Sequence, residues 1–132
     1  MTPDQLINLA AAVARPFRPA PSFSAGTVGC ALLTASGKAF TGVCLDGACG
    51  IGFCAEHAAI AEMVKQHESA IAMVVAVDVD GCVLPPCGRC RELMMQVDPS
   101  NRQTAVILGA TETVPLEDLL PRHWLGPSHR PS

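Results

Sequence analysis

The chain has 132 residues and a formal net charge of −3, with 49% apolar and 16% charged residues. This balance is typical of one packed domain and excludes a disordered chain. The acidic balance, with four phenylalanines, one tryptophan and no tyrosine, argues against polymeric nucleic acid as a partner, because such a surface neither neutralises phosphates nor stacks on bases.

The cysteine content and the apolar runs indicate the cellular compartment of the protein. Seven cysteines are an odd number, and residues 4–15 lack the basic start and long apolar centre of a secretion signal. We therefore expect reduced thiols and a cytoplasmic protein. The longest apolar runs, such as 71–77, are far shorter than the roughly 20 residues that span a bilayer, so no membrane partner is expected.

The first half of the chain predicts one helix and a hairpin. A helix that stops before Arg15 is indicated by apolar side chains at helical spacing, namely Leu6, Leu9, Ala10 and Val13. The next stretch is predicted to contain a turn-rich connector over 16–24, a strand over 28–33, a turn over 36–38, a second strand over 39–45 and a glycine-rich loop over 47–52.

The second half alternates helices and strands. The pattern predicts a helix over 55–67, a buried strand over 71–77, a helix over 88–97 and a buried strand over 104–108. A hairpin followed by alternating helices and strands predicts an α/β fold, a three-layer α/β/α sandwich around a mixed sheet. We expect a single domain over 1–125 and a frayed tail over 126–132.

Three cysteines stand at the starts of two predicted helices. Cys54 precedes the helix over 55–67, and Cys87 and Cys90 stand at the start of the helix over 88–97. If the strands flanking the first helix run parallel, both helix starts lie at one end of the sheet and the thiols can converge. Three ligands leave a fourth position open, as in catalytic zinc sites, where a water becomes a nucleophile near neutral pH.

The neighbours of these cysteines suggest how protons and charge are handled. Glu56, two residues after Cys54, can reach a water in the open position and is the candidate general acid and base. Three thiolates carry one more negative charge than the zinc ion neutralises. We therefore expect the positive N-terminal ends of the two helices, and a hydrogen bond from Arg91 to a ligand sulfur, to offset this excess negative charge. His57 is expected to be a polar residue behind the zinc ligands.

Two other interpretations of the cysteines stay open. Cys87 and Cys90 could form a redox pair at a helix N-terminus, where a thiolate is stabilised. A structural zinc with four protein ligands is the second, and its fourth ligand would be His57, Cys49 or Cys82. Cys30 and Cys44 lie in predicted strands, where a free cysteine is usually a small core residue.

The motifs resemble those of the cytidine deaminase family. Residues Cys54, Ala55 and Glu56 match its Cys-Ala-Glu motif, and the segment 86–91 matches its Pro-Cys-Gly-x-Cys-Arg motif. The resemblance extends over about 28–124. It implies a zinc-dependent hydrolase of pyrimidine salvage that converts cytidine or deoxycytidine to uridine or deoxyuridine and releases ammonia. It also implies a mixed five-stranded sheet and a homo-oligomer, a tetramer or a dimer.

The substrate implied by this resemblance is a small aminopyrimidine nucleoside, but several pocket positions depart from the family. Cys44 and Asp46 stand where typical members carry an Asn-x-Glu pair that binds ribose. Thr27 stands where the family often has a phenylalanine, and His57 where many members have arginine. Asp46 could still accept a hydrogen bond from a sugar hydroxyl, whereas Cys44 is a poor replacement for an amide.

Two further positions complete the expected pocket. Ala55 belongs to the first motif, and Trp124 stands where members often place an aromatic that lines a pocket, either its own or that of a neighbouring subunit. The fungal blasticidin S deaminases also resemble the chain, at Thr27, in a shortened loop before Cys54 and in the Pro-Cys-Gly-Arg-Cys-Arg form of the second motif. Another aminopyrimidine nucleoside or related heterocycle is therefore the alternative substrate.

Overall fold

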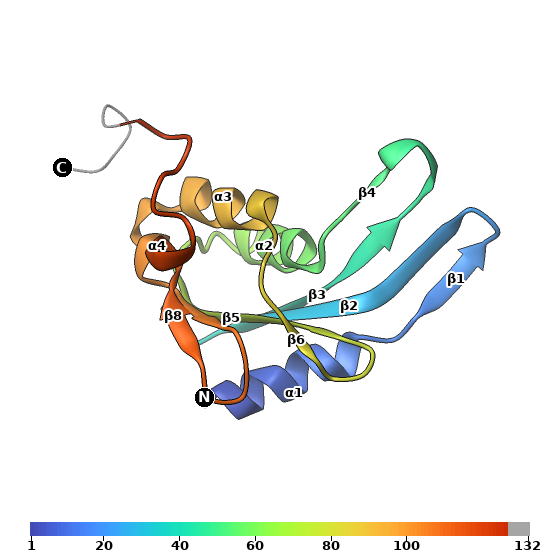
Figure 1. The fold of residues 1–132 in the computed structure, drawn as a ribbon, viewed down its shortest axis with the longest axis horizontal. Helices are drawn as coiled ribbons and strands as arrows, with labels where there is room; N and C mark the ends of the chain where they lie inside the picture. Colours follow the sequence, from blue (N-terminus) through green and yellow to red (C-terminus); the bar gives the residue numbers. More distant parts are fainter. Residues whose placement is uncertain (127–132) are drawn as a thin grey trace.

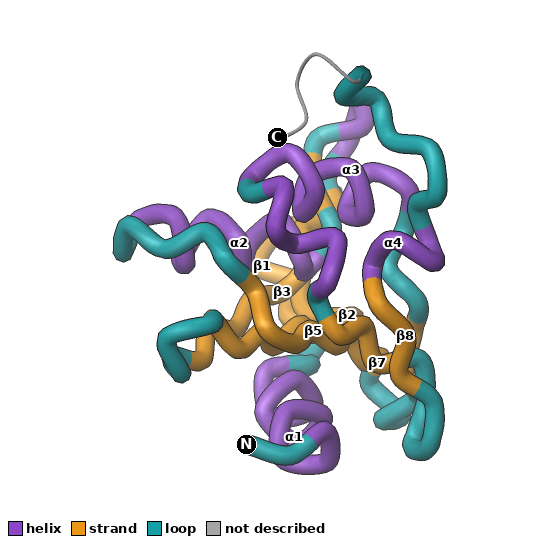
Figure 2. Tube along the Cα trace, turned by 90° about the vertical axis from the view of Figure 1, so that its left-hand side faces the viewer, coloured by secondary structure: helices purple, strands orange, loops and turns teal. Residues whose placement is uncertain are grey.

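The protein folds into three layers in a computed structural model that describes residues 1–126. Helix α1 (Pro3–Val13) covers one face of a mixed sheet (Figure 1), and α2 (Ala55–Lys65), α3 (Gly88–Val97) and α4 (Leu116–Leu119) cover the other. Figure 2 shows α1 on one side of the strands and the other helices opposite. The predicted α/β/α sandwich is confirmed.

Two expectations concern the chain as a whole. The predicted tail over 126–132 lies outside the described residues, except for Gly126. Within the described part, no helix combines the length and the apolar character that a membrane crossing requires.

The described residues form a sheet of eight strands: β1 (Phe17–Ala20), β2 (Phe23–Thr34), β3 (Ala39–Asp46), β4 (Gly52–Phe53), β5 (Ile71–Asp78), β6 (Val83–Leu84), β7 (Ala105–Ile107) and β8 (Thr113–Pro115). Their order is β4-β3-β2-β5-β7-β8, with β1 paired to β2 and β6 to β5. The β5–β7 pair is parallel and the other pairs are antiparallel. The expected count of five strands is too low, because the short strands β1, β4 and β6 extend the sheet.

The connector predicted over 16–24 is wrong. Its residues form β1 and the start of β2, which pair as an antiparallel hairpin with Phe17 opposite Ala25. All of β1 is exposed, so no alternation of apolar and polar side chains marks it in the sequence. Pro19 is compatible with β1 because an edge strand tolerates a residue without a backbone N–H. Two 3-10 helices are also present, Ala48–Gly50 within the predicted glycine-rich loop and Pro99–Gln103 after α3.

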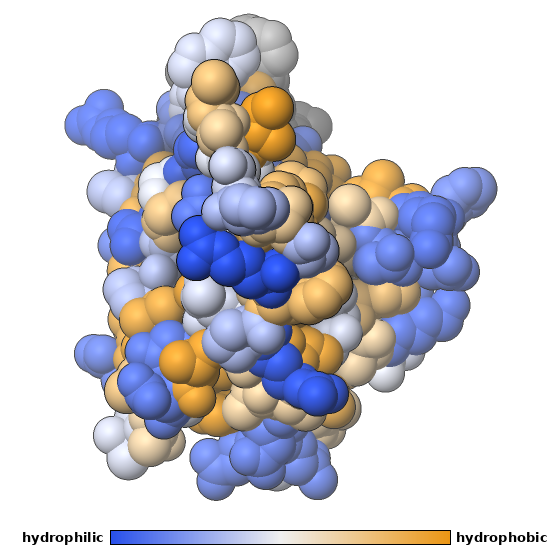
Figure 3. Space-filling model, turned by 90° about the vertical axis from the view of Figure 1, so that its right-hand side faces the viewer, coloured by the Kyte–Doolittle hydropathy of each residue, from blue (hydrophilic) through white to orange (hydrophobic). Residues whose placement is uncertain are grey.

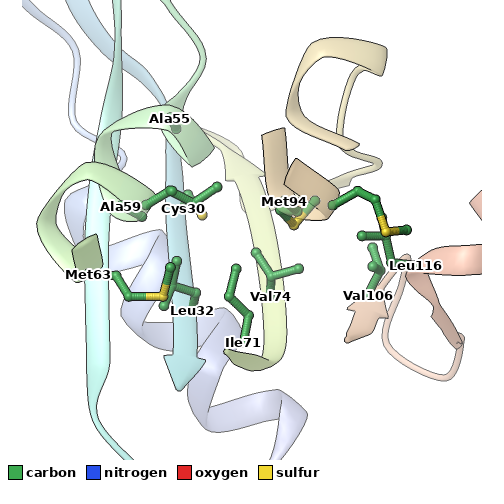
Figure 4. Close-up of a cluster of buried hydrophobic side chains, with 12 residues drawn as sticks. Cys30, Leu32, Ala55, Ala59, Met63, Ile71, Val74, Met94, Val106 and Leu116 are labelled. Carbon is green, nitrogen blue, oxygen red and sulfur yellow. The ribbon is translucent and has the colours of Figure 1, made fainter. Parts of the chain in front are cut away.

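Two buried clusters lie on opposite faces of the sheet, because successive residues of a strand point to opposite sides. In β2, Cys30 and Leu32 face α2, whereas Ala31 faces α1. The first cluster, drawn in Figure 4, contains Cys30, Leu32, Ala55, Ala59, Ile60, Met63, Ile71, Val74, Met94, Met95, Val106 and Leu116. The second contains Leu6, Ala10, Ala14, Ala31, Met73, Val75, Val77 and Ile107. The first cluster packs α2 and α3 against the sheet, and the second packs α1 against its opposite face.

The sheet brings the starts of α2 and α3 to one end. Strands β3 and β5 both pair antiparallel with β2, so they run in the same direction with β2 between them. Asp46, the last residue of β3, pairs with Ser24, and Asp78, the last residue of β5, pairs with Val28. Both strands therefore end beside the first half of β2, and from there the chain enters α2 and α3.

Candidate active site

Three thiols converge at the starts of α2 and α3. Cys54 and Cys87 are the N-cap residues of the two helices, and neither side chain caps its own helix. The Sγ of Cys87 lies 3.4 Å from the Sγ of Cys54 and 3.4 Å from the Sγ of Cys90. The sulfurs of Cys54 and Cys90 lie within 4.8 Å of each other. The structure thus brings together the three cysteines that the sequence singles out.

His57 joins this cluster from the first turn of α2. Its Nδ1 lies 3.5 Å from the Sγ of Cys90, and the ligand atoms of Cys54, His57 and Cys90 all lie within 4.8 Å of one another. Burial, and then the charge of Arg89, lower the pKa of His57 below its ordinary value. The neutral imidazole is therefore favoured, and it has one nitrogen that donates a hydrogen bond.

Glu56 is the buried carboxyl group of the site. It is the second residue of α2 and is only 5% exposed. Burial raises the pKa of the Glu56 carboxyl above its ordinary value. A carboxyl whose pKa is moved toward neutral pH can both accept and release a proton during a reaction, which is what general acid and base catalysis requires.

A pocket with a volume of about 480 Å³ opens at this cluster. Cys54, Glu56 and Cys87 line it, so the sulfurs and the carboxyl face a common space. Much of the remaining wall is apolar and includes Leu45 and Phe53. A pocket of this size, with a few polar groups in an apolar wall, is typical of sites for small molecules.

A comparison with protein families decides what this arrangement is. The family model described as "Cytidine and deoxycytidylate deaminase zinc-binding region" matches residues 2–106. The chain belongs to this family. The matched range contains both cysteine motifs, Glu56 and His57, and the family's description names the metal that the clustered donors would bind.

Individual relatives agree with this assignment. A "Probable cytidine deaminase" from Dictyostelium discoideum is 40% identical over 67 residues, which are 49% of this chain and 46% of that protein. A "Cytidine deaminase" from Halalkalibacterium halodurans is 29% identical over 103 residues, 75% of this chain and 77% of that protein. The crystal structure of a mutant cytidine deaminase from Mycobacterium tuberculosis superposes with a TM-score of 0.79 at 27% identity, covering 94% of this chain and 98% of that one. The fold is therefore that of the cytidine deaminases.

The donors suit the zinc ion of this family. Zinc in proteins takes thiolate and imidazole ligands, and two sulfurs on one tetrahedral zinc lie about 3.8 Å apart. The sulfur separations of 3.4 Å are close to this value. All seven cysteines are free thiols, and Cys49 and Cys82 are exposed and outside the cluster. Of the fourth ligands considered from the sequence, only His57 lies within reach.

The pocket contains most of the substrate residues that the family resemblance suggests. Thr27, Cys44, Asp46 and Ala55 all line it. The Oγ1 of Thr27 lies 3.2 Å from the Sγ of Cys44, so these two small polar groups bind each other across β2 and β3. Asp46, at the end of β3, is exposed at the pocket. Among the described residues, the Asp46 carboxylate has no ion-pair or hydrogen-bond partner.

Trp124 does not line the pocket of its own chain. The residue is 78% exposed, and its backbone N–H donates a hydrogen bond of 2.8 Å to Oε1 of Glu92. Of the two placements that the resemblance allows, the pocket of its own chain is therefore excluded. Its role at a neighbouring subunit's pocket stays a prediction.

Arg91 binds backbone carbonyls, whereas the sequence predicts a hydrogen bond to a ligand sulfur. Its Nε donates a hydrogen bond of 2.7 Å to the carbonyl of Pro86, and its Nη1 donates one of 3.0 Å to the carbonyl of Leu119. Arg91 forms no hydrogen bond to a ligand sulfur within residues 1–126, so that expectation is wrong. The side chain instead fixes the loop that presents Cys87 and ties it to the end of α4.

Phe53 and Arg89 are among the pocket residues that the sequence analysis does not assign to the site. Phe53 lines the pocket and stacks on His57, with ring centroids 6.3 Å apart and an angle of 14° between the planes. Arg89 also lines the pocket, although its position suggests only a solvated side chain at a helix start. The position of Phe53 directly before the Cys-Ala-Glu motif is the signal that could have indicated its role.

Proposed function

We propose that the chain catalyses the zinc-dependent hydrolytic deamination of cytidine or deoxycytidine, giving uridine or deoxyuridine and ammonia. One observation carries the proposal: the carboxyl of Glu56 is buried at a pocket whose wall also contains the thiols of Cys54 and Cys87. The relatives named cytidine deaminase support the substrate class.

Cys54, Cys87 and Cys90 are the zinc ligands in this proposal. Cys87 shares the pocket with Glu56, whereas His57 lines a different hollow beside Gly88 and Glu92. Ligation by the three sulfurs would leave one position open for water, as in catalytic zinc sites. Ligation by His57 as well would close the site, which is the non-catalytic alternative.

The chemistry divides between the metal and Glu56. Zinc, when bound, lowers the pKa of a coordinated water so that it becomes a nucleophile near neutral pH. Glu56 takes a proton from the attacking water and delivers protons to the ring nitrogen and the departing amine. A carbon–oxygen bond forms at the amine-bearing ring carbon, the carbon–nitrogen bond breaks, and ammonia leaves. The raised pKa of Glu56 suits both proton transfers.

Recognition of the sugar depends on a small set of polar groups. Thr27 and Cys44 are 3.2 Å apart and bind each other, so Asp46 is the acceptor left for a ribose hydroxyl in this wall of the pocket. A nucleoside held mainly through its base would also fit such a wall. Another aminopyrimidine nucleoside, such as blasticidin S, is therefore the alternative substrate.

We infer that the protein assembles as a homotetramer or homodimer in the cytoplasm. Large apolar side chains are exposed in the single chain, including Phe17 at 63%, Ile51 at 67% and Trp124 at 78%. The side of the molecule that carries β1 and β4 shows hydrophobic residues interspersed with hydrophilic ones (Figure 3). Sedimentation equilibrium tests this inference, and a monomer at micromolar concentration would contradict it.

Ammonia release by the zinc-loaded protein tests the function. The substrates are cytidine, deoxycytidine, cytosine, blasticidin S, adenosine and guanine, and the key variant is Glu56→Gln. We expect turnover of cytidine by the wild type, and no turnover by Glu56→Gln although it retains zinc. The matched control is Glu62→Gln, an exposed residue of the same helix that pairs with Lys65 at 2.9 Å, and its turnover should be unchanged.

Each outcome of that assay has a meaning. Activity confined to another amine would move the assignment to the alternative substrate. A Glu56→Gln protein that loses zinc and unfolds would show that Glu56 is structural. Full activity in Glu56→Gln would remove it from the mechanism.

A further inference from the structure

The pocket wall and the sulfur cluster are joined by an aromatic pair, Phe53 and His57. Phe53 is the last residue of β4, is 37% exposed and lines the pocket. Its ring stacks on the imidazole of His57, with centroids 6.3 Å apart and planes 14° apart. This is an offset-stacked arrangement of the kind that aromatic pairs favour. The edge of the imidazole therefore packs beside a residue of the pocket wall.

The same imidazole reaches the most buried sulfur of the cluster. Nδ1 of His57 lies 3.5 Å from the Sγ of Cys90, which is fully buried. Arg91 is directed elsewhere, since its guanidinium binds backbone carbonyls. His57 is thus within hydrogen-bonding distance of the Cys90 sulfur, which also has the Glu56 carboxyl as a hydrogen-bond partner.

We propose that Phe53 is a positioning residue that holds His57 with its Nδ1–H directed at the sulfur of Cys90. The proposal rests on the zinc site of the proposed function, with the three cysteines as ligands. A hydrogen bond to a thiolate removes part of the excess negative charge of a three-sulfur set and fixes the ligand in place. The contact with the Phe53 ring limits rotation of the imidazole about its side-chain bonds.

A residue of the pocket wall, Phe53, should therefore affect how tightly zinc binds. Removal of the Phe53 ring leaves His57 present but free to turn away from Cys90. Loss of such a partner of a metal ligand typically lowers metal affinity by about 10- to 100-fold. Zinc affinity should therefore fall about 10-fold in Phe53→Leu. The affinity falls because His57 is no longer held in place, so the effect of Phe53→Leu should disappear when His57 is absent.

Four variants separate stacking from general packing. Phe53→Leu removes the ring but keeps an apolar side chain, Phe53→Tyr keeps the ring, and His57→Phe keeps the stack but removes the donor. Val64→Ala changes an exposed apolar residue of the same helix, 47% exposed, and is the matched control. Far-ultraviolet circular dichroism establishes that each variant is folded before its metal binding is measured.

Two readouts that do not depend on deaminase activity test the proposal. They are zinc affinity, by competition with a chromophoric chelator, and the sulfur-to-cobalt charge-transfer band of the cobalt-substituted protein. We expect Phe53→Leu and His57→Phe to weaken zinc binding and to shift the band similarly, while Phe53→Tyr and Val64→Ala resemble the wild type. Adding Phe53→Leu to His57→Phe should produce no further change.

Several results would overturn the proposal. A Phe53→Leu protein with wild-type affinity and band would remove the positioning role, and so would a Phe53→Tyr protein as impaired as Phe53→Leu. Additive effects in the double variant would show that Phe53 does not act through His57. X-ray absorption that finds a nitrogen ligand in the wild type, absent in His57→Phe, would make His57 a ligand instead. None of these outcomes depends on ammonia release. The positioning role of Phe53 and the deaminase activity are therefore tested by independent measurements.

Discussion

Gly42 of β3 lies directly against the backbone of Ala59 in α2. A Cβ atom on Gly42 would stand 2.4 Å from the backbone nitrogen of Ala59 and 2.7 Å from the carbonyl oxygen of Ala55. Only the absence of a side chain allows the helix to pack this closely on the strand. Since the first turn of α2 carries Glu56, this contact sets the depth at which the carboxyl is buried.

Gly42→Ala should therefore disturb both stability and the site. The added methyl group meets backbone atoms, which cannot rotate away, so α2 must shift outward; overpacking of this kind costs about 1–3 kcal/mol. We expect the free energy of unfolding in urea to fall by that amount and the zinc content to fall with it.

Gly109→Ala is the matched control for this substitution. A Cβ at Gly109 meets nothing within 4 Å, so its unfolding free energy should stay near that of the wild type. Equal stability of Gly42→Ala and Gly109→Ala would show that α2 is not held by this close contact.

The sequence is sufficient to predict the catalytic end of the molecule. Cys54 and Cys87 stand at helix starts, and helix starts are well marked because periodic apolar residues follow at once. The helix predicted over 88–97 has those bounds in the structure. Once two helices begin at the same end of a sheet, the three thiols have little freedom to separate. The convergence of the sulfurs was therefore predictable without knowledge of any contact.

The parts that could not be predicted depend on contacts distant in the sequence. Strand β1 is fully exposed, so its pairing with β2 leaves no pattern of burial in the sequence. Arg91 binds the carbonyl of Leu119, 28 residues away, and nothing local favours that carbonyl over a nearby sulfur. The end of the helix predicted over 55–67 was also set too late, because His67 has a φ of 61°, which no helix residue adopts.

Asp98 should make stability depend on pH. Its carboxylate accepts hydrogen bonds from the Ser69 hydroxyl at 2.8 Å and the Ser100 backbone N–H at 3.0 Å, which tie the end of α3 to the loop after α2. Partial burial alone would raise the pKa of Asp98, but the hydrogen bonds from Ser100 and Ser69 outweigh it and lower the pKa below its ordinary value.

A lowered pKa in the folded state fixes the sign of the effect. The stabilisation by Asp98 is present above the ordinary carboxyl pKa and is lost as the pH falls through the folded-state value. Asp98→Ala should cost about 1 kcal/mol of unfolding free energy at pH 7, and the difference from the wild type should shrink at acidic pH. Urea unfolding at both pH values tests this, with the exposed Asp80→Ala as control. A difference that grows on acidification would contradict the assignment.

Cys87→Ser tests whether the zinc ligands are Cys54, Cys87 and Cys90 or instead Cys54, His57 and Cys90. If Cys87 is a zinc ligand, the serine variant should bind zinc much more weakly, because a hydroxyl is a poorer zinc ligand than a thiolate. Cys82→Ser is the matched control, since Cys82 is an exposed free thiol outside the cluster. Zinc per chain after gel filtration is the measurement. Full zinc in Cys87→Ser would favour the set of Cys54, His57 and Cys90, whose ligand atoms also lie within 4.8 Å of one another.

Asp46→Ala should separate recognition of the sugar from recognition of the base. Asp46 is exposed at the pocket, and a hydrogen bond from a ribose hydroxyl to a carboxylate is worth about 1.5–3 kcal/mol. Its loss should lower kcat/KM for cytidine by about 10- to 100-fold. Cytosine, which has no ribose, should lose little, and Asp80→Ala should affect neither substrate. The decisive quantity is the ratio of kcat/KM for cytidine to that for cytosine. If both substrates lose equally, Asp46 supports the pocket rather than the sugar, and the ribose contact must come from another residue or from a neighbouring subunit.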